Sequence, residues 1–271
     1  MERRAQEVQS SDQSVPRRRL LTGGAALAGA ALLGTAGRAD AATYETVLIN
    51  SFASTAALEA NWNYLYPWGS DHNGTARMYR DRITVSGGVL SLTATRLSSP
   101  EGTSAKPPNL PINYHSGAIH AKHQITVNST YPYYEVGGNF QAPTSTGCWP
   151  AFWLTGVQWP PEADILEYMG TNENAFVTWQ LDGSHNFRKV PVSSPGSWHN
   201  YYATLRKIND TDLSIEYFLD DVRYATHTAP GWVGRPMWLI INLQMEAGSG
   251  SPGPSSATYR ANGVWIGRNK A

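Results

Sequence analysis

The sequence contains a single cysteine, Cys148, in 271 residues, so it cannot form an internal disulfide and its fold must depend on a hydrophobic core. After residue 41 it has no uncharged apolar run of the ~20 residues that a membrane-spanning helix requires. Helical periodicity is also scarce beyond that point. These absences predict a β-rich protein without a membrane partner.

Charge of either sign is also sparse. The chain has 21 basic and 21 acidic residues, and the first 41 residues hold six arginines and four acids. The remainder therefore has 15 basic and 17 acidic residues, a net charge of about −2. Because binding to nucleic acid depends on a positive surface, we expect no nucleic acid partner.

Residues 1–41 have the features of an export signal. Arg17, Arg18 and Arg19 precede an uncharged stretch rich in Ala, Leu and Gly, and a small-x-small cleavage site ends at Ala41. The stretch is too short and too glycine-rich for a membrane anchor. The signal predicts secretion, and its arginine pair fits both the general and the twin-arginine route. Residues 42–271 then form one domain.

Strand-like segments dominate the domain, with turn residues between them. Residues 119–127 alternate mostly apolar odd positions with polar even ones, and Ser54 could cap a short helix. Many short strands and almost no helix predict an all-β antiparallel sandwich of the jelly-roll kind. The other predicted strands span 83–85, 89–94, 133–140, 151–155, 163–168, 176–181, 201–208, 213–219, 222–226, 237–243 and 263–267.

Two segments, 97–111 and 247–256, are rich in Ser, Pro and Gly and have no strand or helix pattern. Each is either a surface loop without a specific role or a wall of a substrate cleft, since loops on a rigid sheet often determine specificity.

Three acids, Glu162, Asp164 and Glu167, lie within six residues. In a regular strand Glu162 and Asp164 share one face, whereas Glu167 points to the other. A one-residue β-bulge between Asp164 and Glu167 would bring all three to the same face. The intervening apolar residues that would then face the core are Ala163, Ile165 and Leu166.

Such crowding of carboxylates suits glycoside hydrolysis, because mutual repulsion keeps one group protonated as an acid while another stays ionised. A retaining glycosidase requires carboxyl groups ~5–5.5 Å apart. Strand rise separates the α-carbons of Glu162 and Glu167 by about 13 Å, so sheet curvature and side-chain convergence would have to close the gap. An exposed acidic strand edge or a calcium site remains the alternative, although calcium loops normally place Gly and Asn among their acids.

The segment Trp149-Pro-Ala-Phe-Trp153-Leu, followed by Trp159-Pro-Pro-Glu162-Ala-Asp164-Ile-Leu-Glu167, resembles glycoside hydrolase family 16. That family includes laminarinases, lichenases, agarases, carrageenases and xyloglucan transglycosylases on a concanavalin-like jelly roll. The resemblance implies that Glu162 is the nucleophile, Asp164 its helper and Glu167 the acid/base of a retaining reaction. Further matching segments are 87–94, 116–119, 134–135 and 198–201.

The sequence departs from the family at three places. Ala163 replaces the usual Ile between the first two acids, and Thr178-Trp179-Gln180 stands where laminarinases commonly have a His. The last strand lacks the usual Asp, which puts a structural calcium in doubt. We therefore predict no cofactor, with a structural calcium as the exception left open.

The residues expected to bind sugar are Trp153 and Trp159, through ring stacking, together with His120 and Gln180 as polar contacts. Each of these residues could instead pack in the core or on an outer face. A basic cleft, as a sulfated galactan would require, could be supplied by His120, Lys122, His123, Arg188 and Lys189.

The Trp-rich segment that precedes Glu162 favours a β-1,3- or mixed-linked glucan as substrate. The segment Tyr114-His-Ser-Gly, and the absence of the His that laminarinases commonly have near Trp179, favour a galactan. We expect a monomeric, secreted endo-β-glycanase that acts on a glucan, with galactan as the alternative. A transglycosylase would share every catalytic residue. A non-catalytic lectin would keep the aromatic residues but would have no need of three aligned acids.

Overall fold

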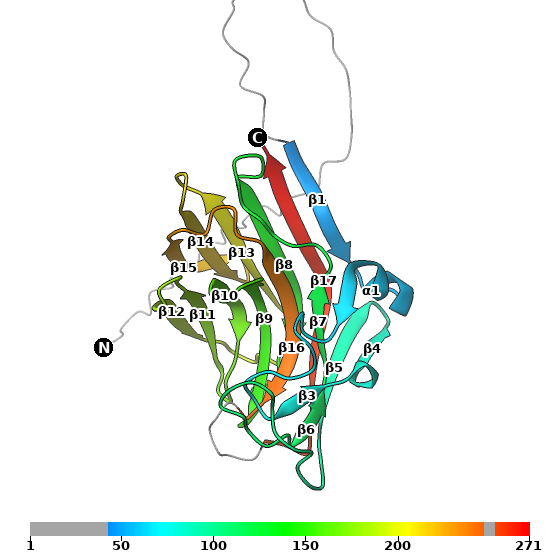
Figure 1. Ribbon diagram of the computed structural model, residues 1–271. Coiled ribbons are helices and arrows are strands. Elements are labelled where there is room, and N and C mark those ends of the chain that lie inside the picture. The colour runs from blue at the N-terminus through cyan, green and yellow to red at the C-terminus, as the bar shows by residue number, and fades with distance from the viewer. Residues whose placement is uncertain (1–42, 247–252) are drawn as a thin grey trace, which may run out of the picture. The chain divides into compact units, whose positions relative to one another are not determined.

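The computed structural model of the chain describes residues 43–246 and 253–271 (Figure 1). These residues form one α-helix, α1 (Thr55–Asn61), one short 3₁₀ turn (Arg80–Arg82) and seventeen strands. The strands are β1 (Thr43–Asn50), β2 (Trp62–Tyr64), β3 (Ala76–Met78), β4 (Ile83–Ser86), β5 (Val89–Arg96), β6 (Tyr114–Ser116), β7 (Ala118–Ala121), β8 (Tyr133–Gln141), β9 (Cys148–Gly156), β10 (Glu162–Glu167), β11 (Glu173–Trp179), β12 (His185–Pro191), β13 (His199–Lys207), β14 (Leu213–Leu219), β15 (Val222–Ala229), β16 (Met237–Met245) and β17 (Ser256–Lys270).

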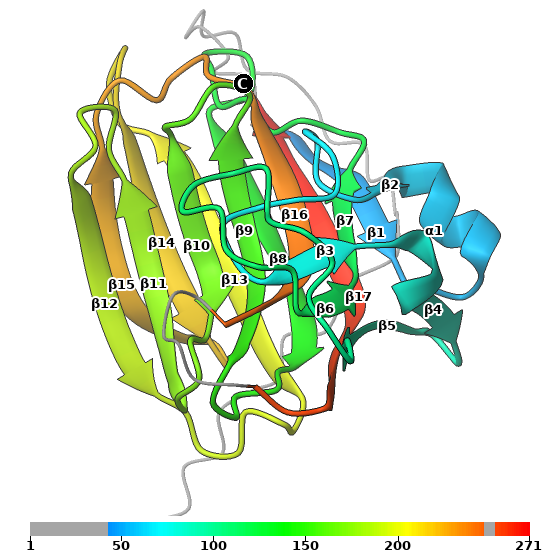
Figure 2. The ribbon, with the colours of Figure 1, turned by 60° about the horizontal axis from the view of Figure 1, so that its bottom comes forward.

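The strands make two sheets that face each other (Figure 2). Ten strands form the first sheet, in the order β15-β14-β13-β8-β17-β5-β6-β3, with β1 beside β17 and β4 beside β5. Seven strands form the second, in the order β12-β11-β10-β9-β16-β7-β2. Only β3 and β6 pair in parallel among the described strands. The predicted antiparallel jelly-roll sandwich is confirmed.

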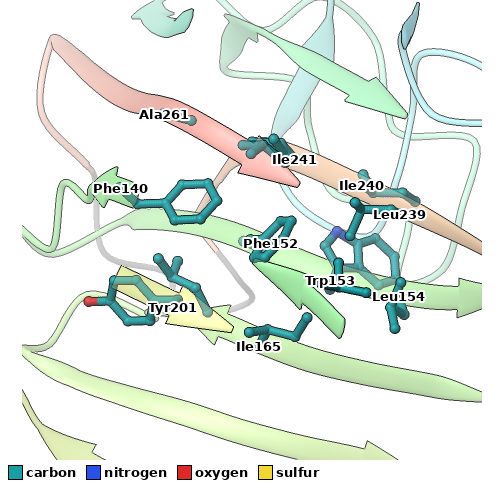
Figure 3. Close-up of a cluster of buried hydrophobic side chains, with 14 of the residues drawn as sticks. Phe140, Phe152, Trp153, Leu154, Ile165, Tyr201, Leu239, Ile240, Ile241 and Ala261 are labelled. Atoms are coloured by element: carbon teal, nitrogen blue, oxygen red, sulfur yellow. The ribbon is translucent and has the colours of Figure 1, made fainter. Parts of the chain in front are cut away.

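The core lies between the sheets, where inward side chains of both interdigitate (Figure 3). Phe140 on β8 and Phe152 on β9 have ring centroids 4.7 Å apart across the layer. Strand β14 shows how the sequence directs this packing, because its alternate residues from Leu213 to Leu219 are buried. Burying a large apolar side chain contributes about 1.5–3 kcal/mol, so the core can stabilise a chain without disulfides.

Two predicted elements have different outcomes. The helix after Ser54 is confirmed, because α1 begins at Thr55 and the Ser54 hydroxyl accepts the N–H of Ala57 at 3.1 Å. The prediction of one strand over 119–127 is wrong, since β7 ends at Ala121 and all four of its residues are buried. Beyond it the chain bends away, and Ile125 pairs only through an isolated bridge to Met237. Apolar and polar residues therefore alternate over 119–127 although the backbone forms no continuous strand there.

Strand β12 was not predicted. Six of its seven residues are exposed, because β12 lies at the edge of the second sheet and covers little of the core. Its sequence therefore lacks the apolar alternation by which half-buried strands are identified.

The predicted export signal, residues 1–41, and residues 247–252 of the second predicted loop lie outside the described residues. No helix within 43–246 and 253–271 is long and apolar enough to cross a membrane.

Candidate active site

Strand β10 carries the three acids and contains the predicted bulge. It pairs with β9 so that Asp164 faces Trp153 and Leu166 faces Phe152, which leaves Ile165 without a partner on β9. The extra residue restores alternation, and the three acids all line one cleft. The intervening residues Ala163, Ile165 and Leu166 are fully buried in the core. The geometry derived from side-chain alternation is therefore confirmed, whereas the chemical role of each acid remains a prediction.

The cleft has a volume of about 760 Å³, which is large enough for several sugar rings. Its floor comes from neighbouring strands β11, β10, β9 and β16, and Lys106 and Pro107 of the predicted loop 97–111 contribute one wall. The full lining comprises Trp68, His72, Asn73, Lys106, Pro107, Trp149, Ala151, Trp153, Thr155, Gly156, Val157, Trp159, Glu162, Asp164, Glu167, Trp179, Asn242 and Gln244.

Each glutamate accepts a hydrogen bond from a different tryptophan. The indole N–H of Trp159 donates to Glu162 Oε2 at 3.1 Å, and that of Trp149 donates to Glu167 Oε1 at 2.8 Å. Both bonds restrict the carboxyl groups to one orientation and leave the second oxygen of each available to a ligand. The tryptophans thus orient the acids as well as lining the cleft.

Burial makes ionisation of the acids unfavourable. It is the largest cause raising the pKa of Glu162 to about 8, and the charge of Glu167 adds to it. Burial also raises the pKa of Asp164 well above its usual range, followed by the charges of both glutamates. The cluster therefore retains protons at neutral pH, on Asp164 and within the glutamate pair.

The environment of Glu167 differs from that of its partners. Burial raises its pKa, but the Trp149 hydrogen bond and the positive charge of Lys189 lower it. Trp149 and Lys189 therefore offset part of the effect of burial on Glu167. Because the two glutamates repel each other, one proton resides on the pair and can lie on either member.

The predicted sugar-binding residues fall into two groups. Trp153 and Trp159 line the cleft, Trp153 buried in the floor and Trp159 58% exposed at its rim. Trp153 is fixed by its indole N–H, which donates to Asn242 Oδ1 at 2.7 Å. Neither Gln180 nor His120 is among the cleft-lining residues.

His120 and Gln180 have other partners. The Nδ1 of His120 is 2.9 Å from the Leu65 carbonyl oxygen and its Nε2 is 3.1 Å from the Asn63 amide nitrogen, so neighbouring groups occupy both ring nitrogens. Gln180 follows the end of β11 and donates to the Thr228 carbonyl at 2.9 Å. The cleft-facing residue at this end of β11 is Trp179, which pairs with Glu162 across the strands.

The basic residues considered for the cleft do not line it. The Lys122 ammonium donates to the Glu59 carbonyl at 2.5 Å, and only the charge of Lys189 reaches Glu167. Lys106, from the loop, is the lysine in the cleft wall. No group of three or more His, Cys, Asp or Glu suited to a metal ion occurs within residues 43–246 and 253–271.

Sequence reasoning missed one side of the cleft, formed by residues 68–73. The His72 ring stacks on Trp153, with centroids 5.7 Å apart and planes 14° from parallel, and Trp68 meets the same Trp edge-on. Burial lowers the pKa of His72 to about 4, so its imidazole is neutral and serves as a flat packing surface. This segment has no periodicity, and only folding brings it to the acids.

No family model matches the chain. Among curated proteins, a galactan endo-β-1,3-galactanase of Flammulina velutipes is 46% identical over 233 residues, which cover 84% of this chain and 91% of that protein. The chain belongs to glycoside hydrolase family 16. It is an endo-β-glycanase.

More distant relatives share part of the sequence or the fold. An endo-1,3-1,4-β-glycanase of Rhizobium meliloti is 27% identical over 177 residues, which cover 63% of this family 16 chain and 35% of that protein. The solved endo-1,3-β-glucanase of Streptomyces sioyaensis superposes with a TM-score of 0.64 at 20% identity, covering 83% of this chain and 96% of that one. Porphyranase B of Zobellia galactanivorans superposes with a TM-score of 0.65 at 17% identity, covering 88% of this chain and 96% of that one. At such identities the structures establish a shared fold only.

Proposed function

We propose that this family 16 enzyme is a retaining hydrolase that cleaves internal β-1,3 bonds of a galactan. The observation that carries the catalytic part is the bulge of β10, which places Glu162, Asp164 and Glu167 on one cleft surface. The substrate follows from the 46% identity to a galactanase along most of both chains, compared with 27% to a glycanase over part of them. This identity favours the galactan alternative over the glucan to which the sequence inclined.

In the proposed reaction a Glu162 oxygen attacks the anomeric carbon while Glu167 gives its proton to the departing glycosidic oxygen. The bond from the anomeric carbon to that oxygen breaks, and a covalent glycosyl-enzyme forms on Glu162. Glu167, now ionised, removes a proton from water, whose oxygen displaces Glu162 from the same carbon. Two inversions retain the anomeric configuration.

This assignment requires the proton of the glutamate pair to be on Glu167 once the polymer is bound. In the free site burial raises the pKa of Glu167, and the Trp149 hydrogen bond and the charge of Lys189 offset part of this effect. A glycosidic oxygen accepting a hydrogen bond from Glu167, with the electron-poor anomeric carbon beside Glu162, favours that arrangement. Asp164 keeps its own proton and adds no third charge beside Glu162.

Aromatic residues on both sides of the acids are suited to hold a chain of sugars. Trp159 and Trp179 lie with ring centroids 6.0 Å apart beside Glu162, and Trp68 and Trp153 lie 6.2 Å apart on the opposite side. Sugar rings present apolar faces that pack on indole rings. A cleft with aromatic surfaces on both sides of the reacting groups fits cleavage within a polymer.

The first test compares reducing ends released from β-1,3-galactan, laminarin, lichenan, agarose and carrageenan. We expect β-1,3-galactan to be cleaved fastest, and faster release from laminarin or lichenan would restore the glucan assignment. Binding without release of reducing ends from any polymer would identify a lectin. Proton NMR during the first turnovers should show the β-anomer, and wild-type turnover by Glu162→Gln would refute its role as nucleophile.

We further propose that residues 1–41 direct export, that the mature enzyme is a monomer and that it needs no cofactor. The support for export is the arginine-led apolar stretch, followed by a small-x-small site that ends at Ala41. Mass spectrometry of secreted protein should find a new N-terminus after Ala41. Size-exclusion chromatography with light scattering tests the monomer, and undiminished turnover in EDTA tests the absence of a metal requirement.

A further inference from the structure

The backbone ladder between β10 and β11 stops in the middle of the active strand. Glu162 pairs with Trp179 and Asp164 pairs with Val177, and the pairing between the two strands ends at Asp164. Continuing the same antiparallel register would put Glu167 opposite Asn174. The bulge at Ile165 shifts β10 at this point, so its backbone groups need partners other than the β11 backbone.

The side chain of Asn174 provides these partners. Its Oδ1 accepts the backbone N–H of Glu167 at 3.0 Å, and its Nδ2 donates to the carbonyl of Ile165 at 3.3 Å. Asn174 is completely buried, so water cannot replace either bond. A primary amide offers a donor and an acceptor on one short side chain, as this pair of backbone groups requires.

We propose that Asn174 is a positioning residue that holds the bulge and thereby sets the location of the Glu167 carboxyl group. Glu167 is fixed at both ends, through its backbone N–H by Asn174 and through its Oε1 by the Trp149 indole. The inference rests on the proposed acid/base role of Glu167. A proton donor must lie within about 2.6–3.2 Å of the leaving oxygen, and a displacement of ~1 Å can cost about 10²-fold in rate.

The experiment uses two substrates that differ in their need for an acid. Cleavage of the polymer expels a sugar alkoxide that requires a proton, whereas 2,4-dinitrophenyl β-1,3-galactobioside expels a stable phenolate that does not. Values of kcat/KM report the step in which the glycosidic bond breaks. For Asn174→Ala we expect a loss of about 10²-fold on β-1,3-galactan and a loss of less than about threefold on the dinitrophenyl substrate.

Asn50 offers a matched control. It is also buried, accepts the Phe52 N–H at 2.7 Å and donates to the Ala57 carbonyl at 3.2 Å beside α1, and it is not part of the cleft. Asn50→Ala therefore removes an equivalent pair of side-chain bonds to the backbone. It should lower the melting temperature as Asn174→Ala does, and should leave kcat/KM for both substrates unchanged.

Glu167→Ala separates the failure of this inference from the failure of the proposed function. If Glu167→Ala slows both substrates equally, Glu167 is not the acid and the proposed function is wrong. If Glu167→Ala discriminates between the substrates but Asn174→Ala slows both equally or neither, Glu167 keeps its role and the positioning role of Asn174 is refuted. Selective loss on the polymer in both variants, with Asn50→Ala unaffected, supports both.

Discussion

Replacing Glu162 by Gln should stabilise the fold at neutral pH while abolishing hydrolysis. Burial and the charge of Glu167 raise the Glu162 pKa from its ordinary 4.5 to about 8. Between these pH values the folded protein holds a proton that the unfolded chain has released, so the free energy of unfolding falls as pH rises through this window. A neutral amide has no proton to lose and avoids the penalty.

The size of the gain follows from the pKa difference. Each pH unit is worth 1.36 kcal/mol, so the interval from 4.5 to pH 7 corresponds to about 3 kcal/mol. The glutamine oxygen can still accept the Trp159 indole N–H at the position of Glu162 Oε2. We therefore expect Glu162→Gln to raise the free energy of unfolding by about 3 kcal/mol at pH 7 and by almost nothing at pH 4.

Urea unfolding followed by tryptophan fluorescence at pH 4, 5, 6 and 7 measures this difference. Glu173→Gln is the control, because Glu173 is an exposed acid at the start of the neighbouring strand β11. Its stability should follow that of the wild type at every pH. Equal stability of Glu162→Gln and wild type at pH 7, or a gain that does not change with pH, would refute the reasoning.

Three other substitutions test separate parts of the structure. Glu167→Ala should lower kcat/KM on polymer by roughly 10²–10⁴-fold. Azide should restore its turnover of a dinitrophenyl glycoside, with a glycosyl azide as the product. Absence of this rescue in a folded variant would contradict the acid/base role. Trp149→Phe removes the hydrogen bond that lowers the Glu167 pKa, so the alkaline limb of the plot of kcat/KM against pH should move to higher pH. An unchanged alkaline limb would show that this hydrogen bond does not control the Glu167 pKa. Gly137→Ala would place a Cβ 2.4 Å from the Trp265 ring on the neighbouring strand β17 of the same sheet, so it should destabilise the fold by about 1–3 kcal/mol with KM unchanged. Wild-type stability in urea would contradict this prediction.

The parts predicted correctly from the sequence are those governed by local backbone geometry. Side-chain alternation is fixed by the strand itself, so the spacing of Glu162, Asp164 and Glu167 required a bulge, and the pairing of β10 with β9 contains one. The cap at Ser54 depends on neighbours only three residues away. Such features do not need knowledge of the rest of the fold.

The missed features depend on contacts between distant segments. His72 reaches Trp153 only because its loop forms one side of the cleft, and no sequence pattern near His72 indicates this contact. The sequence predicts Gln180 as a sugar contact, whereas its neighbour Trp179 lines the cleft. The exact end and register of β11 decide which of these two adjacent residues points to the acids. His120 is on a strand, as predicted, but residues of other segments occupy its ring nitrogens.

The bulge also determines how this strand tolerates changes in length. Deletion of Ile165 would leave Glu-Ala-Asp-Leu-Glu, in which the acids occupy alternate positions of a regular strand and share one face without any bulge. An inserted residue beside Ile165 would instead turn Glu167 toward the core, unless a second irregularity absorbed it. Loss of one codon here could thus preserve the order and facing of the carboxylates. The strand has two lengths compatible with its chemistry, and this protein has the longer one.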